Sequence, residues 1–186
     1  IDPLDRRTDF QYDTRNRKTH DILPEVEVVG EDGVLGLMRP TIVTAYDEVG
    51  NVISVTDPRG HTTTTEYDGL NRPFRVTDPL GQQTQSVYDE NGNVTDVYDA
   101  NGYHTQNAYD ALNRLESTTS PEGITVSYEY DEDSNRTAVI AGNPGQPART
   151  DMTYDGLKRL LKTIHPDGND HENRYDELNK IEWEDE

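Results

Sequence analysis

Short segments rich in Thr, Val, Ile and Tyr alternate along most of this 186-residue chain with short polar segments that begin with Asp. The Asp residues that open the polar segments stand at positions 47, 57, 68, 78, 89, 99 and 110, in alternating steps of ten and eleven. That interval leaves room for strands of about six residues, whereas helices of usual length do not fit. The pattern predicts almost no helix and antiparallel strands near 52–56, 61–67, 72–77, 82–88, 93–98, 103–109, 114–119, 124–130, 159–164 and 170–175.

The polar segments have the composition of type I turns. Asp47 to Gly50 and Asp57 to Gly60 both place Asp at the first turn position and Gly at the fourth. Asp bonds the backbone from the first position, and Gly at the fourth adopts the left-handed conformation of a bulge. Two neighbouring segments joined by such a turn therefore predict a β-hairpin.

The hairpins belong to a tandem repeat. Tyr-Asp recurs at steps of 21 residues from Tyr46 to Tyr130, and after one step of 24 residues it resumes from Tyr154 to Tyr175. A Gly follows the Tyr by fourteen residues in most copies. Residues spread this evenly are typical of a repeat architecture. We expect the structural repeat residues to be Tyr46, Asp47, Gly60, Tyr67, Asp68, Gly81, Tyr88, Asp89, Gly102, Tyr109, Asp110, Gly123, Tyr130, Asp131, Tyr154, Asp155, Gly168, Tyr175 and Asp176.

One hairpin cannot fold alone, because burying one Tyr ring offsets only a small part of the backbone entropy of its copy. Stacking edge to edge in a continuous antiparallel sheet supplies the missing hydrogen bonds and cross-strand pairs. We expect this all-β sheet to align the Tyr residues with the Leu three places later, and we expect Tyr88 to matter more for stability than Tyr103, which lies off the register. The leucines are Leu70, Leu112, Leu157 and Leu178.

These features resemble the YD-repeat, or rearrangement-hot-spot (Rhs), proteins, closely over residues 46–186 and loosely over 12–45. The resemblance implies hairpins wound into a spiral hollow shell, as in bacterial polymorphic toxins, insecticidal toxin complex subunits and teneurins. It implies a secreted or cell-surface structural protein whose partners are neighbouring YD repeats and an encapsulated C-terminal toxic domain. An adhesion module that binds carbohydrate or protein is the alternative.

The aspartate-based self-cleavage of some family members is not expected here. Pro73, Asp78, Pro79 and Gly81 imitate part of that motif, but Asp78 to Gly81 falls on the turn register of the repeat. We therefore expect no enzyme activity, no catalytic residue and no cofactor. The missing initial Met and the end at Glu186, within a copy, predict a piece of a longer protein whose toxic or receptor-binding part lies outside it.

Composition limits the partners. The net charge of −20 disfavours nucleic acid and anionic membrane surfaces, since phosphate binding needs the opposite sign. With 31% hydrophobic residues, the chain is too polar for a thick two-layer core. It has no Cys and no long apolar run, so we expect neither a disulfide framework nor membrane insertion.

Three groups of residues suggest binding chemistry, each beside a structural interpretation. Asp131 to Asn135 opens like a calcium loop, although a longer turn fits better because Arg136 replaces the required Gly. A cluster of His and carboxylates suits zinc or nickel, or turn polarity alone. Three aromatic residues suit sugar stacking or ordinary sheet packing. The cluster is His165, Asp167, Asp170 and His171, and the aromatic residues are Phe74, Tyr128 and Tyr130.

Residues 1–45 are expected to be a degenerate first repeat, and residues 46–186 the regular array. Tyr12-Asp13 begins this first copy, which has an insertion between Ile22 and Pro40 that is interpreted as an extra hairpin. The insertion and the irregular loop 142–147 are the places where a partner would contact the chain. Unpaired strand edges near 12–20 and 176–186 predict self-association, with more of it at higher ionic strength.

Overall fold

The computed structural model describes residues 7–29, 33, 35–142, 147–176 and 181–185. These residues form strands and turns, without a helix among them. The strands are β1 (Asp9–Tyr12), β2 (Lys18–Ile22), β3 (Val26–Val29), β4 (Leu35–Met38), β5 (Thr41–Tyr46), β6 (Val52–Thr56), β7 (Thr62–Tyr67), β8 (Pro73–Thr77), β9 (Gln83–Tyr88), β10 (Val94–Tyr98), β11 (His104–Tyr109), β12 (Leu115–Thr119), β13 (Thr125–Tyr130), β14 (Arg136–Gly142), β15 (Ala148–Tyr154), β16 (Leu160–Ile164), β17 (Asp170–Tyr175) and β18 (Ile181–Asp185).

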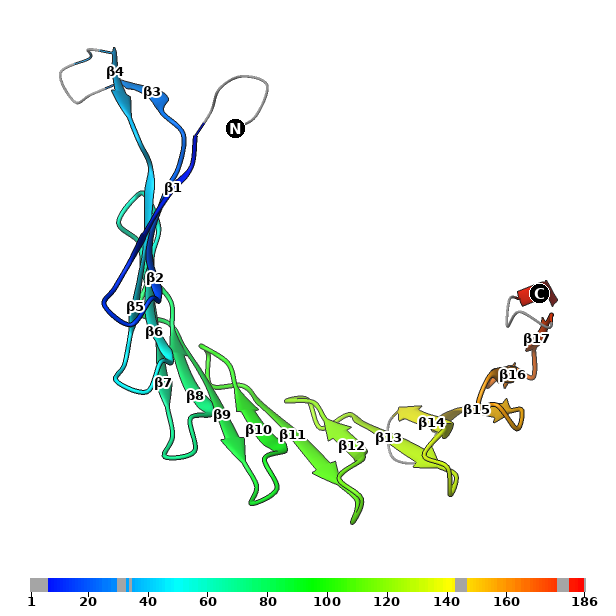
Figure 1. Ribbon diagram of the computed structural model, residues 1–186. Coiled ribbons are helices and arrows are strands. Elements are labelled where there is room, and N and C mark those ends of the chain that lie inside the picture. The colour runs from blue at the N-terminus through cyan, green and yellow to red at the C-terminus, as the bar shows by residue number, and fades with distance from the viewer. Residues whose placement is uncertain (1–6, 30–32, 34, 143–146, 177–180, 186) are drawn as a thin grey trace. The chain divides into compact units, whose positions relative to one another are not determined.

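The chain divides into two compact units, Ile1–Ser86 and Val87–Glu186. In the first unit the strand order is β1-β2-β5-β6-β7-β8, and in the second unit the order runs from β10 to β18, while the boundary between the units falls within β9. The strand pairs within each unit are antiparallel. They join strands that are consecutive in the chain, apart from β2 and β5, which pair across the insertion. Figure 1 shows β5 to β8 side by side. The predicted all-β fold of tandem hairpins is confirmed.

The strand boundaries agree with the sequence pattern to within one residue. Strands β6 and β17 begin and end at the predicted residues, and the other predicted strands begin one residue later and end at the predicted residue. The late start has a physical reason, because the first residue after each turn closes the turn through its carbonyl. The N–H of Asp110, for example, donates to the carbonyl of Arg114 at 2.9 Å.

The sheet has little buried interior. Among the described residues, Ala138 is the buried hydrophobic residue, at 0% exposure, and Asn173 is the buried polar one. One face carries the repeated Tyr with Thr and Val at alternate positions, for example Thr65 opposite Val76. The other face carries cross-strand ion pairs such as Glu66–Arg75. A one-layer sheet is therefore stabilised mainly by strand hydrogen bonds and cross-strand neighbours.

The expected alignment of leucines with the Tyr ring was wrong for the leucines that the structure describes. Leu70, Leu112 and Leu157 are 69%, 67% and 69% exposed. Each occupies the third position of its turn. There the side chain extends into solvent from the end of the hairpin and does not lie on a face of the sheet. Leu178 lies outside the described residues.

The insertion in the first copy forms the expected extra hairpin. Strands β3 and β4 pair only with each other in a separate two-stranded sheet, apart from the long sheet of the first unit (Figure 1). Its apolar side chains are open to solvent, with Val29, Leu35 and Leu37 exposed by 66%, 66% and 68%. The 24-residue copy differs in another way, because β14 and β15 lengthen to seven residues each.

Candidate functional site: the turns of the tyrosine edge

The Tyr-Asp turns of the repeat register all lie at one end of the hairpins, which we call the tyrosine edge, whereas Tyr98-Asp99, which is off that register, opens a turn at the other end. The turns of the tyrosine edge open with Asp13, Asp47, Asp68, Asp89, Asp110, Asp131 and Asp155. The turns at the other end, the opposite edge, open with Asp57, Asp78, Asp99, Ser120 and His165. The residues predicted to be structural are thus divided between the two edges, with Tyr and Asp at the first and Gly60, Gly81, Gly102, Gly123 and Gly168 at the second.

A Tyr-Asp turn is closed by its own Asp. In the turn at Asp110, one carboxylate oxygen accepts the backbone N–H of Leu112 at 2.8 Å and that of Arg114 at 3.0 Å. The fourth residue, Asn113, has a φ of 60°, the left-handed region in which Asn and Gly are tolerated. The predicted type I turn with a left-handed fourth residue is confirmed, with Asn, Ser or Lys replacing Gly in several copies.

These hydrogen bonds stabilise the ionised carboxylates. The backbone N–H of Arg114, and then its side chain, hold the pKa of Asp110 below the ordinary value of 3.8 although partial burial opposes them. Asp68 and Asp155 have a lowered pKa for the same reason, with Arg72 and Arg159 as donors. At Asp131 the side-chain amide of Asn135 is the largest cause of the lowered pKa.

Arginine joins one turn to the next hairpin. Arg114 Nε donates to Asp110 at 2.6 Å, and its guanidinium lies 4.6 Å from the ring centre of Tyr130, which belongs to the following hairpin. Its Nη1 also donates to the backbone carbonyl of Asp131 at 3.1 Å. One side chain therefore closes its own turn and covers the next Tyr ring. The same stacking occurs for Arg17 on Tyr46 at 4.7 Å and for Arg159 on Tyr175 at 4.5 Å.

Asparagine provides a second kind of link. Asn51 donates from its side-chain amide to Asp47 at 2.8 Å and to the amide oxygen of Asn71 in the next hairpin at 2.9 Å. Asn93 does the same with Asp89 at 2.8 Å and with Asn113 at 3.0 Å.

The two kinds of turn alternate, which the sequence interpretation missed. The signal was the residue five places after each register Tyr from Tyr12 to Tyr154, which is Arg or Asn in alternation and predicts a structural unit of two hairpins. These residues are Arg17, Asn51, Arg72, Asn93, Arg114, Asn135 and Arg159.

The Tyr hydroxyl adds a third contact between hairpins. Tyr130 donates to the carbonyl of Leu115 at 2.9 Å, and Tyr67 donates to Val52 at 3.0 Å, in both cases fifteen residues back in the chain. The strand register shifts by one residue at each of these Tyr positions. A bulge of this kind changes the direction of a side chain. Here it lets the Tyr hydroxyl reach the carbonyl of the first residue of the preceding strand.

The opposite edge is built from local contacts. Asp99 accepts the backbone N–H of Tyr103 at 2.9 Å, and Gly102 donates to the Asp99 carbonyl at 3.0 Å. Asp78 likewise accepts the N–H of Leu80 at 2.9 Å and opens a turn with Gly81. Asp78 therefore has the bonding of its neighbours on the register.

The residues singled out for metal binding are not brought together. Asp167 accepts hydrogen bonds from Asn169, and Asp170 forms an ion pair with Lys162. Within the described ranges, no three His, Cys, Asp or Glu side chains are grouped so that they could hold a metal ion. Asp131 accepts the N–H of Asp133 at 3.0 Å as the opening residue of an ordinary turn, which favours the turn over the calcium loop.

The aromatic residues considered for sugar stacking pair with arginines instead. Arg136 lies 5.6 Å from the ring centre of Tyr128, and Arg75 lies 5.3 Å from that of Phe74. Tyr130 is covered by Arg114. Phe74 belongs to the first unit and the two Tyr residues to the second.

The part of the chain that the structure describes offers no helix of the length and hydrophobicity needed to cross a lipid bilayer.

The antiparallel hairpins and the interlinked Tyr-Asp turns define a β-hairpin repeat protein. The family model RHS Repeat matches residues 46–83, 75–104, 88–125 and 109–146, which together cover more than half of the chain. The chain belongs to this RHS repeat family. No curated protein matches it.

Three solved structures are similar in fold. The crystal structure of TcdB2-TccC3 without its hypervariable C-terminal region has a TM-score of 0.68 at 16% identity, covering 89% of this chain and 10% of that one. The crystal structure of TcdB2-TccC3 has a TM-score of 0.67 at 16% identity, covering 89% and 11%. A Tc holotoxin pore of Photorhabdus luminescens with a TccC3 mutation has a TM-score of 0.66 at 16% identity, covering 89% and 10%. The chain thus spans about a tenth of those chains.

Proposed function

We propose that this array forms part of the wall of a hollow shell that encloses a toxic or effector domain of a secreted or surface-delivered bacterial protein. The observation that carries the proposal is the side-chain link between consecutive hairpins at the tyrosine edge, made by Arg17, Asn51, Asn93, Arg114 and Arg159. A one-layer sheet linked in this way can be lengthened copy by copy, since each copy contacts only its neighbours.

Two of the similar structures support this function, because they belong to toxin complexes. One is a Tc holotoxin pore, and another lacks a hypervariable C-terminal region. By analogy, the partners of this chain are the neighbouring hairpins of the same array and an enclosed C-terminal domain. The register Asp residues, such as Asp68, Asp110 and Asp155, are engaged in turn closure, so we infer that the repeat residues are structural and that none is catalytic.

The test uses the full-length protein that contains the array. Electron cryomicroscopy should show a hollow particle, and trypsin should cleave the C-terminal domain much more slowly in that protein than in isolation. Arg114→Ala, which removes a link between hairpins, should shorten this protection, whereas Arg59→Ala at the opposite edge should not. Equal cleavage of the enclosed and the isolated domain would contradict encapsulation.

The outermost strand of the first unit supports a second expectation, self-association of the 186-residue chain. On β1, Phe10 and Tyr12 are 50% and 54% exposed beside an open strand edge. The net charge of −20 opposes association at low salt, so raising the ionic strength should promote it. Light scattering across a salt series measures this, and a strict monomer at high salt would contradict it. In parallel, hydrolase substrates and nucleic acid should give neither turnover nor binding.

A further inference from the structure

The β3–β4 hairpin carries apolar side chains that are unusually open to solvent. Val29, Leu35 and Leu37 are more exposed than any other large apolar strand residue whose exposure the structure describes. In the long sheet of the first unit, by comparison, Val55 and Val76 are 39% exposed. The difference arises because β6 and β8 have a neighbouring strand on both sides, whereas β3 and β4 pair only with each other (Figure 1).

Cross-strand pairing gathers these side chains on one face of the hairpin. Glu27 pairs with Leu37, and Val29 pairs with Leu35. Residues two places apart on a strand lie on the same face, so these four residues share a face, which we call the insertion face. A two-stranded sheet is at best marginally stable in water. A partner that covers the insertion face would therefore stabilise the hairpin while it buries the apolar side chains.

The charge that the hairpin leaves open is negative. Glu25 and Glu27 are exposed, and neither forms an ion pair with a described residue. Arg39 is held at the base of the hairpin, where it donates to the carboxylate of Asp9 at 2.5 Å and to the carbonyl of Leu23 at 3.0 Å. A partner of the insertion face is therefore expected to bring a positive charge to Glu27 beside its own apolar side chains.

The dimensions of the insertion face fit one α-helix. The face is two strands wide and four residues long, which corresponds to about 10 Å by about 13 Å. A helix has a diameter of about 10 Å and rises about 1.5 Å per residue, so about nine residues span the face. A strand added to an open edge of β3 or β4 would leave the apolar side chains in water.

Two other occupants fit the insertion face less well. A second copy of this chain has no helix among its described residues, and it would bring a further net charge of −20 to an acidic surface. A lipid bilayer would have to take up the charged Glu27 together with the leucines, which opposes insertion.

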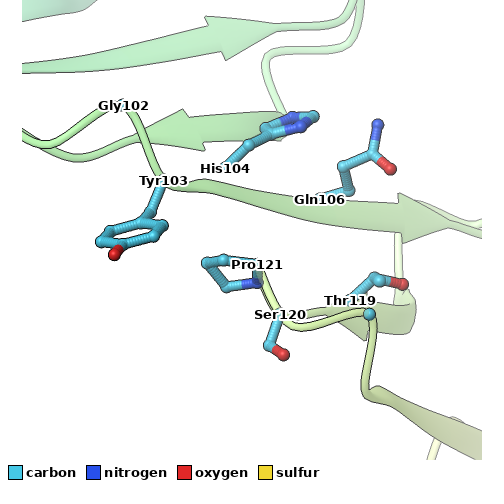
Figure 2. A pocket seen from close by; sticks show the side chains of 8 residues that line it. Gly102, Tyr103, His104, Gln106, Thr119, Ser120 and Pro121 are labelled. Atoms are coloured by element: carbon cyan, nitrogen blue, oxygen red, sulfur yellow. The ribbon is translucent and has the colours of Figure 1, made fainter.

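The groove at the opposite edge of the second unit, between the turn after β10 and the turn after β12, differs from the insertion face (Figure 2). Its polar side chains are engaged within the chain, since Ser120 donates to Glu122 at 2.7 Å and His104 Nε2 lies 2.7 Å from Asp96 Oδ1. Figure 2 shows the Tyr103 ring on the side of Ser120, with His104 directed to the other side of β11. One ligand face therefore does not contact both rings.

We propose that the insertion face binds a basic amphipathic α-helix of a partner protein. The apolar stripe of such a helix covers Val29, Leu35 and Leu37, and a Lys or Arg beside the stripe pairs with Glu27. This inference goes beyond the shell function, because the proposed wall is formed by the array and the hairpin is separate from its sheet.

The experiment titrates the 186-residue chain, at a concentration at which it is monomeric, with a Leu/Lys peptide of about 14 residues whose leucines follow the helical period. Calorimetry and amide chemical shifts follow the binding. The peptide should bind saturably and shift the amides of residues 26–29 and 35–38. Leu37→Ser should weaken the binding about tenfold, because burial of a Leu side chain contributes on that order. Glu27→Gln should weaken it about threefold at low salt and less at high salt.

Leu112→Ser is the matched control, because Leu112 is almost as exposed as Leu37 but lies in a turn of the array. It should leave binding unchanged. Absence of saturable binding, or equal binding by wild type and Leu37→Ser, would overturn the proposal. Tighter binding of a peptide with strictly alternating Leu and Lys would assign the hairpin to strand addition and would also overturn it. The same holds if phosphatidylcholine vesicles shift these amides while the helical peptide does not.

Discussion

The tyrosine edge and the opposite edge of the hairpins are built from the same type I turn. Their side chains differ in what they contact, the next hairpin at the first edge and their own turn at the second. At the tyrosine edge, Arg114 extends from its own turn to the ring of Tyr130 in the next hairpin. At the opposite edge, Asp99 bonds only backbone groups of its own turn. The long-range contacts of the array are thus concentrated at one edge, which leaves the sequence of the other edge free to vary.

The largest expected effect concerns the Asp carboxylates that close the turns of the tyrosine edge. The pKa of Asp68, Asp110 and Asp155 is lowered in the folded chain, mainly by backbone hydrogen bonds. Above the ordinary value of 3.8 both states are ionised and the stabilisation is complete. Below it the unfolded chain binds protons first, so stability is lost as the pH falls through the folded pKa.

We therefore expect a constant melting temperature from neutral pH to about pH 5 and a steep fall below about pH 4. Protonation also reduces the net charge of −20, which acts in the opposite direction by weakening repulsion. Thermal melts at low and high salt separate the two effects. A melting temperature that rises steadily down to pH 3 would show that turn carboxylates contribute less than charge repulsion.

Next in size is the loss of a ring at the tyrosine edge. Tyr130→Ala removes the surface that Arg114 covers and the hydroxyl that donates to Leu115. We expect a loss of about 3–5 kcal/mol in the free energy of unfolding, as for other large-to-small aromatic substitutions. Tyr103→Ala at the opposite edge should cost less than about 0.5 kcal/mol, since surface substitutions rarely cost more. Urea denaturation compares the two, and equal midpoints would remove the distinction between the edges.

A smaller effect is expected for the link itself. Arg114→Ala removes the stacking on Tyr130 and the hydrogen bond to the Asp131 carbonyl, so we expect a loss of about 2 kcal/mol. Arg59→Ala is the control, because Arg59 is an exposed residue within an opposite-edge turn. Its denaturation midpoint should equal that of wild type. If both variants unfold at the same urea concentration, the arginines do not join the hairpins.

The smallest effect is predicted for the exposed turn leucines. Leu112→Ser should change the free energy of unfolding by less than about 0.5 kcal/mol, because Leu112 is 67% exposed and extends from the edge. Denaturation of this variant beside Val97→Ser, in the middle of β10, measures the difference. A cost for Leu112→Ser as large as that for Val97→Ser would restore the packing role that the sequence pattern suggested.

The hairpins could be predicted from the sequence because their determinants are local. An Asp at the first turn position bonds N–H groups two and four residues away, as Asp47 does with Val49 and Asn51, so a short window contains both partners. The Thr, Val and Tyr residues between the turns then favour strands over helices. Strand spans and turn types followed from this chemistry.

What the sequence did not reveal depends on contacts outside that window. Leu112 has the spacing of a packed residue, but the turn geometry directs it away from the sheet. The partner of Arg114 is the following Tyr, which lies in the next hairpin, so the alternation of Arg and Asn has no meaning until the hairpins are placed side by side.

The alternation of Arg and Asn also predicts which changes in the number of repeat copies the array tolerates. Asn51 donates to the side chain of Asn71, whereas one copy further on the equivalent residue is Gly92, which has no side-chain acceptor. Removing one 21-residue copy would bring Asn51 opposite Gly92, while removing two copies would bring it opposite Asn113 and restore the amide pair. Unequal recombination within this array is therefore expected to leave working proteins mainly when it adds or removes copies in pairs.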